Sequence, residues 1–310
     1  MILLLIFTLS TLLILGGCSN NNNQPNESDQ DKLKIVATYS IIYDIAKNIA
    51  GDEVIIHSLA PIGSNPHEYD PLPNDVKNTT DADVVFYNGL NLEQGNSWFK
   101  KLIETAGKSG EGAPVYMVSE GVDAIQLESK GLENQMDPHA WLDITNGIKY
   151  AENIREALIE VDPDNASKYR DNADNYIKEL EALHKDTIEK IKQIPEAKRF
   201  LITSEGAFKY FGRAYGLETG YIWEINAENQ GSPQQIRAVV DLIRDKGIKA
   251  LFIETSIDRR SMETVSDETE VPIVGTVYTD SLGAPGTDGD TYLKMMQVNT
   301  SVIIDGLSKQ

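Results

Sequence analysis

Short strand-forming runs alternate with amphipathic helical segments on both sides of one unusually long helical stretch. Within residues 165–194, apolar side chains recur at steps of three to five residues, which predicts one helix of about 45 Å at roughly 1.5 Å per residue. Alternating strands and helices predict βαβ units with mostly parallel sheets. The chain is therefore predicted to be α/β, with two lobes joined by one long rigid helix that ends at Pro195.

The expected strands and helices divide between the two lobes. For the N-terminal lobe, residues 32–164, the expected strands are 34–39, 54–59, 83–87 and 114–118, and the helices are 41–50, 76–81, 98–105 and 148–158. The linking helix covers 165–195. For the C-terminal lobe, residues 196–310, the expected strands are 199–203, 221–225, 250–254 and 272–277, and the helices are 207–215, 234–245 and 291–307. Ligands of open α/β sheets lie at the carboxyl ends of the strands, which predicts a site in a cleft between the lobes.

The first 31 residues predict export and lipid anchoring. Residues 1–17 are almost continuously apolar and carry no charge, which is the pattern of a signal peptide. They end in Gly16-Gly17 before Cys18, and small residues just before a cysteine resemble a bacterial lipobox. Residues 18–31 are polar and form a flexible tether after the lipidated Cys18. We expect a folded body on the extracytoplasmic face of the cell membrane; the alternative is a membrane anchor with an incidental cysteine.

Composition excludes several classes of function. The 28 Lys and Arg against 48 Asp and Glu give a net charge of −20, which argues against a nucleic-acid surface and suits a protein that works near cations. The single cysteine excludes an internal disulfide and any multi-cysteine zinc or iron–sulfur site.

Two of the four histidines occur in the same local context. His67 and His139 each follow a proline in a loop, and proline stiffens the backbone that carries the imidazole. This shared context predicts two metal ligands; the alternative is two loop histidines without a common role. His57 lies inside a predicted strand and is expected to be half-buried there. His184 is expected on a solvated face of the long helix.

Acidic ligands are expected from the C-terminal lobe. Glu205 and Asp280 each follow a predicted strand, where a carboxylate can reach a site at the sheet edge. Glu254 also ends a strand and is the reserve candidate. Other acids in comparable places are interpreted as helix N-caps: Asp143, Asp258 and Asp290.

Five segments resemble a known family. They are NPHEYDPLPNDV (65–76), DPHAWLD (137–143), TSEGAFKYFGRAYGL (203–217), FIETSIDRRSMETV (252–265) and VGTVYTDSLG (274–283). In this order they resemble the cluster A-I metal-binding lipoproteins, which are the solute-binding components of manganese, zinc and iron ABC importers. The match is best with the manganese-binding branch, of which several members are called adhesins.

The resemblance implies a structure and a ligand set. It implies two Rossmann-like lobes joined by one long helix. The family's metal ligands correspond to the same four residues that the loops and strand ends indicate: His67, His139, Glu205 and Asp280. The implied partners are a membrane permease with its cytoplasmic ATPase, and the protein is expected to be a monomer.

The donor set bears on the choice of metal. Two imidazoles and two carboxylates form a harder set than a zinc site usually has, which favours Mn²⁺ or Fe²⁺. Residues 120–137 contain no histidine, whereas the zinc branch typically has a third histidine and a His-rich loop. Mn²⁺ is the expected cargo, with Zn²⁺ and Fe²⁺ as alternatives, because the Irving–Williams order gives the same site at least equal affinity for zinc.

Two other classes of function are weighed against transport. A two-His, carboxylate site also occurs in non-haem iron oxygenases and some metallohydrolases, but the sequence has no HExxH motif, nucleophile elbow or triad candidate, so no enzyme is expected. A surface adhesin with a structural metal site is the other alternative. The stiff linking helix predicts a small movement of the lobes rather than a wide hinge opening.

We predict that Mn²⁺ affinity falls as the pH is lowered from about 8 to about 5, because an imidazole that binds a metal must be neutral. Titration of the protein with Mn²⁺ across this range measures the effect. Constant affinity throughout would contradict histidine ligation.

Overall fold

Parallel strands make up the sheets in the computed structural model, which describes residues 32–52, 54–226 and 230–309. In the N-terminal half the strand order is β2–β1–β3–β4, and all three ladders are parallel. The strands of this sheet are β1 (Leu33–Ala37), β2 (Val54–Ser58), β3 (Val84–Tyr87) and β4 (Val115–Met117). The mostly parallel α/β fold predicted from the sequence is confirmed.

The C-terminal half contains two parallel strand pairs, β5–β6 and β7–β8. Strand β5 lies beside β7, so the two pairs are neighbours. The strands are β5 (Phe200–Glu205), β6 (Glu218–Trp223), β7 (Leu251–Glu254) and β8 (Ile273–Val277). Strand β6 begins three residues earlier than predicted, because Glu218 already pairs with Phe200.

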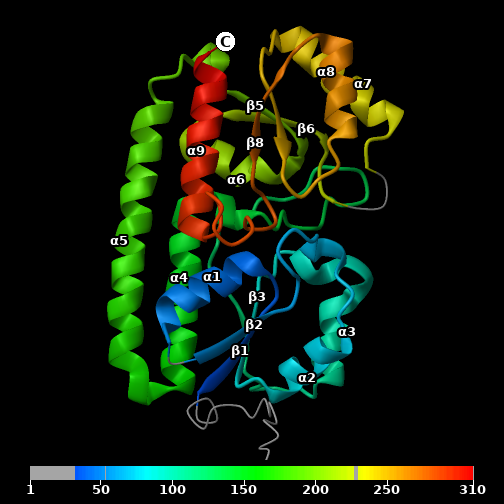
Figure 1. Ribbon diagram of the computed structural model, residues 1–310. Coiled ribbons are helices and arrows are strands. Elements are labelled where there is room, and N and C mark those ends of the chain that lie inside the picture. Colours follow the sequence, from blue (N-terminus) through cyan, green and yellow to red (C-terminus); the bar gives the residue numbers. More distant parts are fainter. Residues whose placement is uncertain (1–31, 53, 227–229, 310) are drawn as a thin grey trace, which may run out of the picture. The chain divides into compact units, whose positions relative to one another are not determined.

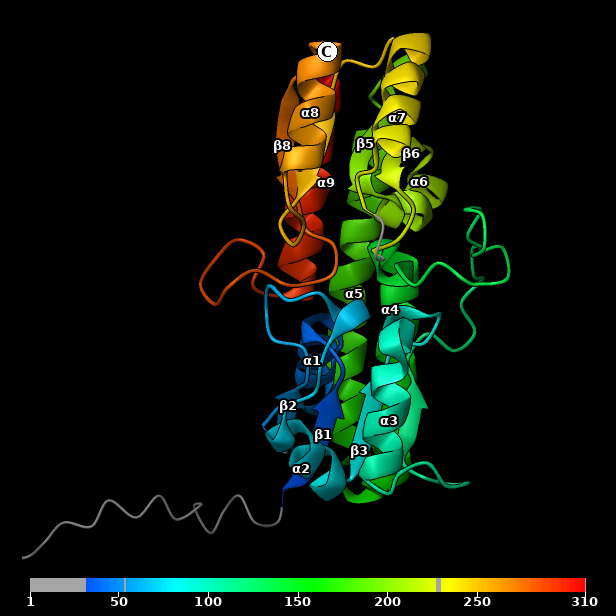
Figure 2. The same ribbon diagram turned by 90° about the vertical axis from the view of Figure 1, so that its right-hand side faces the viewer.

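Helices cover both faces of the strands (Figure 1). Their bounds are α1 (Ser40–Ala50), α2 (Pro73–Asp81), α3 (Trp98–Thr105), α4 (Ile144–Val161), α5 (Ala166–Ile191), α6 (Lys209–Tyr215), α7 (Pro233–Lys246), α8 (Arg260–Thr269) and α9 (Tyr292–Ser308). Seen from the side, the strands of one half lie above those of the other, and the loops at their facing ends lie between them (Figure 2).

Successive side chains of a strand point to opposite faces of the sheet, which explains why helices can pack on both faces. In β1, Ile35 and Ala37 belong to the largest buried cluster, whereas Val36 between them faces a separate cluster with α3. In β5, Leu201 faces the largest cluster and Ile202 faces another one with α7 and α8. Strands β1 and β5 are therefore packed on both faces, as is usual for parallel sheets.

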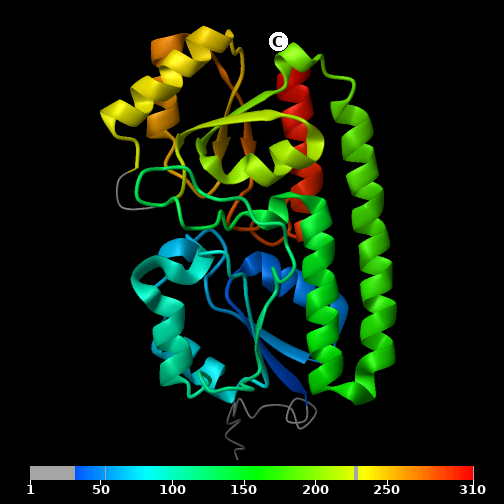
Figure 3. The ribbon, with the colours of Figure 1, turned by 180° about the vertical axis from the view of Figure 1, so that it is seen from behind.

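The longest helix, α5, packs on elements of both halves. It contacts α1 and α4 of the N-terminal half and α6 and α9 of the C-terminal half. Figures 1 and 3 show it running along both halves. Its buried positions follow the predicted apolar stripe: Tyr169, Ala173, Tyr176, Leu180, Leu183, Thr187 and Ile191. The largest buried cluster contains side chains from both halves and from α5.

The predicted C-terminal end of this helix is wrong. Helix α5 ends at Ile191, four residues before Pro195. Tight turns follow, in which Gln193 N–H donates to Lys190 O and Ile194 N–H donates to Ile191 O. Ile194 is buried, and a residue that precedes proline avoids the helical conformation, so the chain leaves the helix before Pro195.

The predicted signal peptide, the tether and Cys18 lie outside the described residues. Among the residues that the structure describes, no helix is both long and apolar enough to span a bilayer.

Helices α4 and α9 meet at a position where only glycine fits. A Cβ at Gly147 would overlap the hydroxyl of Tyr292. Tyr292 cannot easily move, because it is fully buried and its hydroxyl donates to Trp141 O at 2.6 Å. This contact fixes the helix that follows the His139 segment against the last helix of the chain.

We predict that Gly147→Ala lowers the free energy of unfolding by about 1–3 kcal/mol, the usual cost of overpacking a core. The loss is expected even though alanine favours a helix over glycine by about 1 kcal/mol. Denaturant unfolding of the metal-free protein measures it. Gly110→Ala is the control, because a Cβ there meets nothing within 4 Å; equal stability of the two variants would contradict the prediction.

Candidate metal centre

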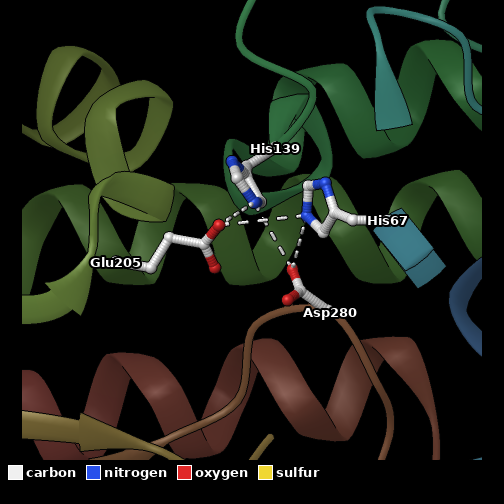
Figure 4. A group of neighbouring side chains, drawn as sticks. All are labelled: His67, His139, Glu205 and Asp280. Carbon is white, nitrogen blue, oxygen red and sulfur yellow. Dashed lines mark ion pairs between the residues drawn. The ribbon is translucent and has the colours of Figure 1, made fainter. Parts of the chain in front are cut away.

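Four side chains from four separate segments converge between the two halves. They are His67, His139, Glu205 and Asp280, and one donor atom from each lies within 4.8 Å of the others (Figure 4). All four are buried, with exposed fractions of 0–3%. The structure thus brings together the four residues that the sequence predicts as ligands, at a place shielded from solvent.

The spacing of the donor atoms suits a single ion. His139 Nε2 lies 3.4 Å from Asp280 Oδ1 and 3.6 Å from Glu205 Oε1. His67 Nε2 lies 4.0 Å and 3.9 Å from the same oxygens. Two donors that bind one ion at about 2.1 Å can be at most about 4.2 Å apart. The two imidazole rings are neighbours, with centroids 5.4 Å apart.

The Pro66–Glu68 turn delivers His67. Pro66 is the first residue of this short 3₁₀ helix, and the Asn65 side chain caps it by accepting the His67 N–H at 2.9 Å. Trp98 Nε1 donates to Pro66 O at 3.2 Å from the start of α3. Both bonds hold the Pro66–His67 peptide unit, which carries the imidazole.

Asp137 orients His139. Its Oδ1 lies 2.9 Å from both the main-chain nitrogen and Nδ1 of His139. Because an ionised carboxylate can only accept, Nδ1 donates to Asp137 Oδ1, which assigns the proton to Nδ1 and leaves the Nε2 lone pair for the centre. Lys209 Nζ lies 3.5 Å from Asp137 Oδ2 and holds the other side of this carboxylate.

Strand ends and neighbouring backbone position the two acids. Glu205 is the last residue of β5, and its N–H donates to Glu254 Oε1 at 2.8 Å. Asp280 follows β8, in a segment that Trp141 Nε1 fixes by donating to Thr279 O at 3.0 Å. Glu205 Oε1 and Asp280 Oδ2 both accept hydrogen bonds from Asn226.

The four groups strongly perturb one another's titration. Burial lowers the pKa of His67 to about 4. Burial would also lower the pKa of His139, but the carboxylates of Asp137 and Glu205 outweigh it and raise this pKa well above the usual value. Burial, with the charge of Asp280 beside it, raises the pKa of Glu205. Burial would raise the pKa of Asp280, but the two imidazoles and Asn226 outweigh it and lower that pKa.

One atom of each side chain lacks a hydrogen-bond partner among the described residues. These atoms are His67 Nε2, His139 Nε2, Glu205 Oε2 and Asp280 Oδ1, all buried. A buried polar atom without a partner costs about 1–3 kcal/mol, so four in one place require a compensating ligand. A divalent cation fits, because imidazole nitrogens and carboxylate oxygens both bind it and the two carboxylates balance its charge.

The remaining candidates lie outside this group. His57 is half-buried in β2 as predicted, with Nε2 2.7 Å from Asp75 Oδ1. The prediction for His184 is wrong, because the ring is half-buried and its Nδ1 lies 3.0 Å from the hydroxyl of Tyr215. The reserve candidate Glu254 contacts the backbone of Glu205 instead of joining the group, and burial raises its pKa to about 7.

Of the three predicted helix N-caps, one is confirmed. Asp143 caps α4 by accepting the Thr145 N–H. Asp258 accepts the Arg260 N–H one residue before the N-cap of α8, Arg259. Asp290 pairs with Lys294, and the cap of α9 is Thr291.

Sequence reasoning missed the residues that orient the four predicted ligands. Asp137 stands two residues before His139, within the DPHAWLD segment, and that spacing would have indicated it. Asn226 is remote in sequence from both acids that it contacts, and no pattern in the sequence indicates it.

Comparison with known families agrees with this geometry. The model described as ZnuA: Zinc-uptake complex component A periplasmic matches residues 35–306. The chain belongs to this family. The resemblance to solute-binding proteins of metal importers is confirmed.

Relatives in the family are similar along nearly their whole length. The metal ABC transporter substrate-binding lipoprotein SsaB of Streptococcus sanguinis is 50% identical over 306 residues, which cover 97% of this chain and 98% of the relative. The manganese ABC transporter substrate-binding lipoprotein scaA of Streptococcus gordonii is 49% identical over 306 residues, or 98% of each chain.

Solved structures in the family share the fold. The Mn-bound periplasmic metal binding protein from Candidatus Liberibacter asiaticus is similar with a TM-score of 0.80 and 31% identity, covering 89% of this chain and 100% of that one. The periplasmic zinc binding protein TroA from Treponema pallidum gives a TM-score of 0.81 at 29% identity, covering 89% and 99%.

We predict that Asp137→Ala lowers divalent-metal affinity about 10–100-fold, the usual cost of losing a group that orients a ligand. The imidazole of His139 then loses the acceptor of its Nδ1–H. Asp137→Asn keeps an acceptor oxygen and is expected to lose less.

Metal titration followed by competition measures both variants. Asp162→Ala is the control. Asp162 also accepts two side-chain hydrogen bonds, from Tyr169 and Asn165, but it is remote in sequence from the four side chains. If Asp137→Ala bound metal as tightly as the control, Asp137 would have no role in orienting His139.

Proposed function

We propose that this protein captures a divalent metal ion outside the cytoplasm and delivers it to the permease of an ABC importer, which a cytoplasmic ATPase drives. The observation that carries the proposal is the buried group of His67, His139, Glu205 and Asp280, in which one donor atom from each residue lies within 4.8 Å of the others. Membership of the family and the names of the relatives supply the transport context.

Mn²⁺ is the proposed cargo, and Zn²⁺ and Fe²⁺ are the alternatives. Two carboxylates make the donor set hard, which favours Mn²⁺ or Fe²⁺ over a sulfur- or histidine-rich zinc set. A relative that is 49% identical is named a manganese transporter component, and a solved structure of the fold is Mn-bound. Zn²⁺ would bind these donors at least as tightly in isolation, so supply in the cell contributes to the choice.

Binding and release, rather than catalysis, is the proposed chemistry. In a four-coordinate complex the protein donors fill every position and leave none for an activated water. Both imidazoles come from the N-terminal half and both carboxylates from the C-terminal half, so the ion would bridge the halves. Such a site suits a carrier whose segments must separate to release the ion.

The proposal includes the anchor and the assembly. Lipidation at Cys18, after a signal peptide of residues 1–17, would hold the protein at the outer face of the cell membrane, with residues 18–31 as the tether. The relatives named above are lipoproteins. We propose that the protein works as a monomer, because all four donors come from one chain.

We predict that alanine at any of the four positions lowers Mn²⁺ affinity by at least about 100-fold, beyond the 10–100-fold loss typical of groups that only orient a ligand. Mn²⁺ should also raise the Tm of the wild-type protein, since it binds the folded state, and should not raise that of the variants. Titration calorimetry and thermal unfolding with and without Mn²⁺ measure these effects.

His184→Ala is the control for the histidine variants, because His184 lies on α5 and outside the group. It is expected to keep wild-type affinity. The proposed centre would be wrong if His67→Ala or His139→Ala behaved like His184→Ala. Metal analysis of protein from its native cell, followed by competition between Mn²⁺ and Zn²⁺, tests the cargo.

A further inference from the structure

Asn226 contacts both acids of the proposed metal centre. Its main-chain N–H donates to Glu205 Oε1 at 2.5 Å, and its side-chain Nδ2 donates to Asp280 Oδ2 at 3.2 Å. The residue is itself buried, with 8% of its surface exposed. One residue therefore ties together two carboxylates that come from different strand pairs.

Trp223 fixes the orientation of the Asn226 amide. The indole Nε1–H can only donate, and it lies 3.1 Å from Asn226 Oδ1. The amide oxygen must therefore face Trp223, which turns the NH₂ group toward Asp280. Trp223 ends β6 in register with Glu205 on β5, so the strand pair that carries one acid also orients the group that holds the other.

Asn226 acts differently on the two carboxylates. Asp280 Oδ2 is occupied by the amide, whereas Asp280 Oδ1 has no hydrogen-bond partner in the described part of the chain and lies 3.4 Å from His139 Nε2. In Glu205, the Asn226 N–H donates to Oε1, which is also the oxygen that lies 3.6 Å from His139 Nε2 and 3.9 Å from His67 Nε2. Asp280 thus keeps an oxygen without a hydrogen bond for an ion, and Asn226 holds in place the Glu205 oxygen that faces the imidazoles.

We infer that Asn226 is a positioning residue of the metal centre: its side chain selects which oxygen of Asp280 meets the ion, and its main chain holds Glu205 at the matching distance. This inference rests on the proposed function. The two buried carboxylates repel each other, so without a donor between them Asp280 can rotate or move away.

The two contacts of Asn226 can be separated by mutation. Any residue other than proline keeps the main-chain N–H that Glu205 accepts, so removing the side chain leaves the bond to Glu205 and removes those to Asp280 and Trp223. Asn226→Ala is expected to lower Mn²⁺ affinity about 10–100-fold, as for other groups that orient a ligand. It is also expected to change the electron paramagnetic resonance spectrum of bound Mn²⁺, because Asp280 then offers a different oxygen arrangement.

Asn153→Ala is the matched control. The Asn153 side chain donates to Val118 O and Glu120 O, so it also holds backbone through two hydrogen bonds, but outside the metal centre. This variant is expected to keep the wild-type Mn²⁺ affinity and spectrum, whatever happens to its Tm.

The outcomes separate a positioning role from a structural one. Wild-type affinity and spectrum in a folded Asn226→Ala protein would overturn the inference. Weaker binding with an unchanged spectrum and a lower Tm would also overturn it, because that result describes a general loss of stability.

If Asn226→Ala does not fold, Trp223→Phe gives the answer by the same criteria, since it removes the donor that orients the amide and keeps an aromatic ring. A smaller change in the same direction is expected. Failure of the wild-type protein to bind Mn²⁺, Zn²⁺ or Fe²⁺ would instead refute the proposed function, and so is distinguishable from failure of this inference.

Discussion

Two imidazoles and two carboxylates meet where the protein excludes water, with one donor atom of each within 4.8 Å of the others and one buried atom of each without a hydrogen-bond partner among the described residues. Each such atom costs about 1–3 kcal/mol when nothing compensates it, and the two carboxylates also repel each other. A divalent cation offsets all of these terms at once. A protein without such a cargo would gain stability by replacing the four groups with apolar side chains, as is often found for buried charges.

The α/β architecture supplies the means of placing these groups. Parallel strands end at one edge of a sheet, so Glu205 and Asp280 arrive side by side although 75 residues separate them by number (280 − 205). The histidines come from the facing half on proline-stiffened turns, where Asn65 and Asp137 fix the backbone beside each ring. Rigid delivery from both sides replaces the close sequence spacing that many metal motifs use.

The four residues of the buried group could be predicted because the scarcity of histidine and the local chemistry single them out. With four histidines in the chain, a repeated Pro-His context at His67 and His139 is informative, and a carboxylate after a strand indicates a sheet edge. The orienting groups could not be found in this way. Asn226 acts through one amide whose direction Trp223 sets, and such a contact depends on register between strands. Likewise α5 ends early because of local turns before Pro195, and His184 is half-buried because Tyr215 packs on it.

The same packing bears on how an ion would leave. The largest apolar cluster includes Ile35 from one half, Phe252 from the other and Leu180 from α5, so swinging the halves widely apart would expose it at about 25 cal/mol per Å². The donor-bearing segments are held differently, by a few hydrogen bonds from groups such as Asn65, Asn226 and Trp141. Breaking two or three such bonds costs far less than opening a shared core, since each contributes about 1 kcal/mol net. Release is therefore expected to begin with the segments around His67 and Asp280, while α5 keeps the two halves together.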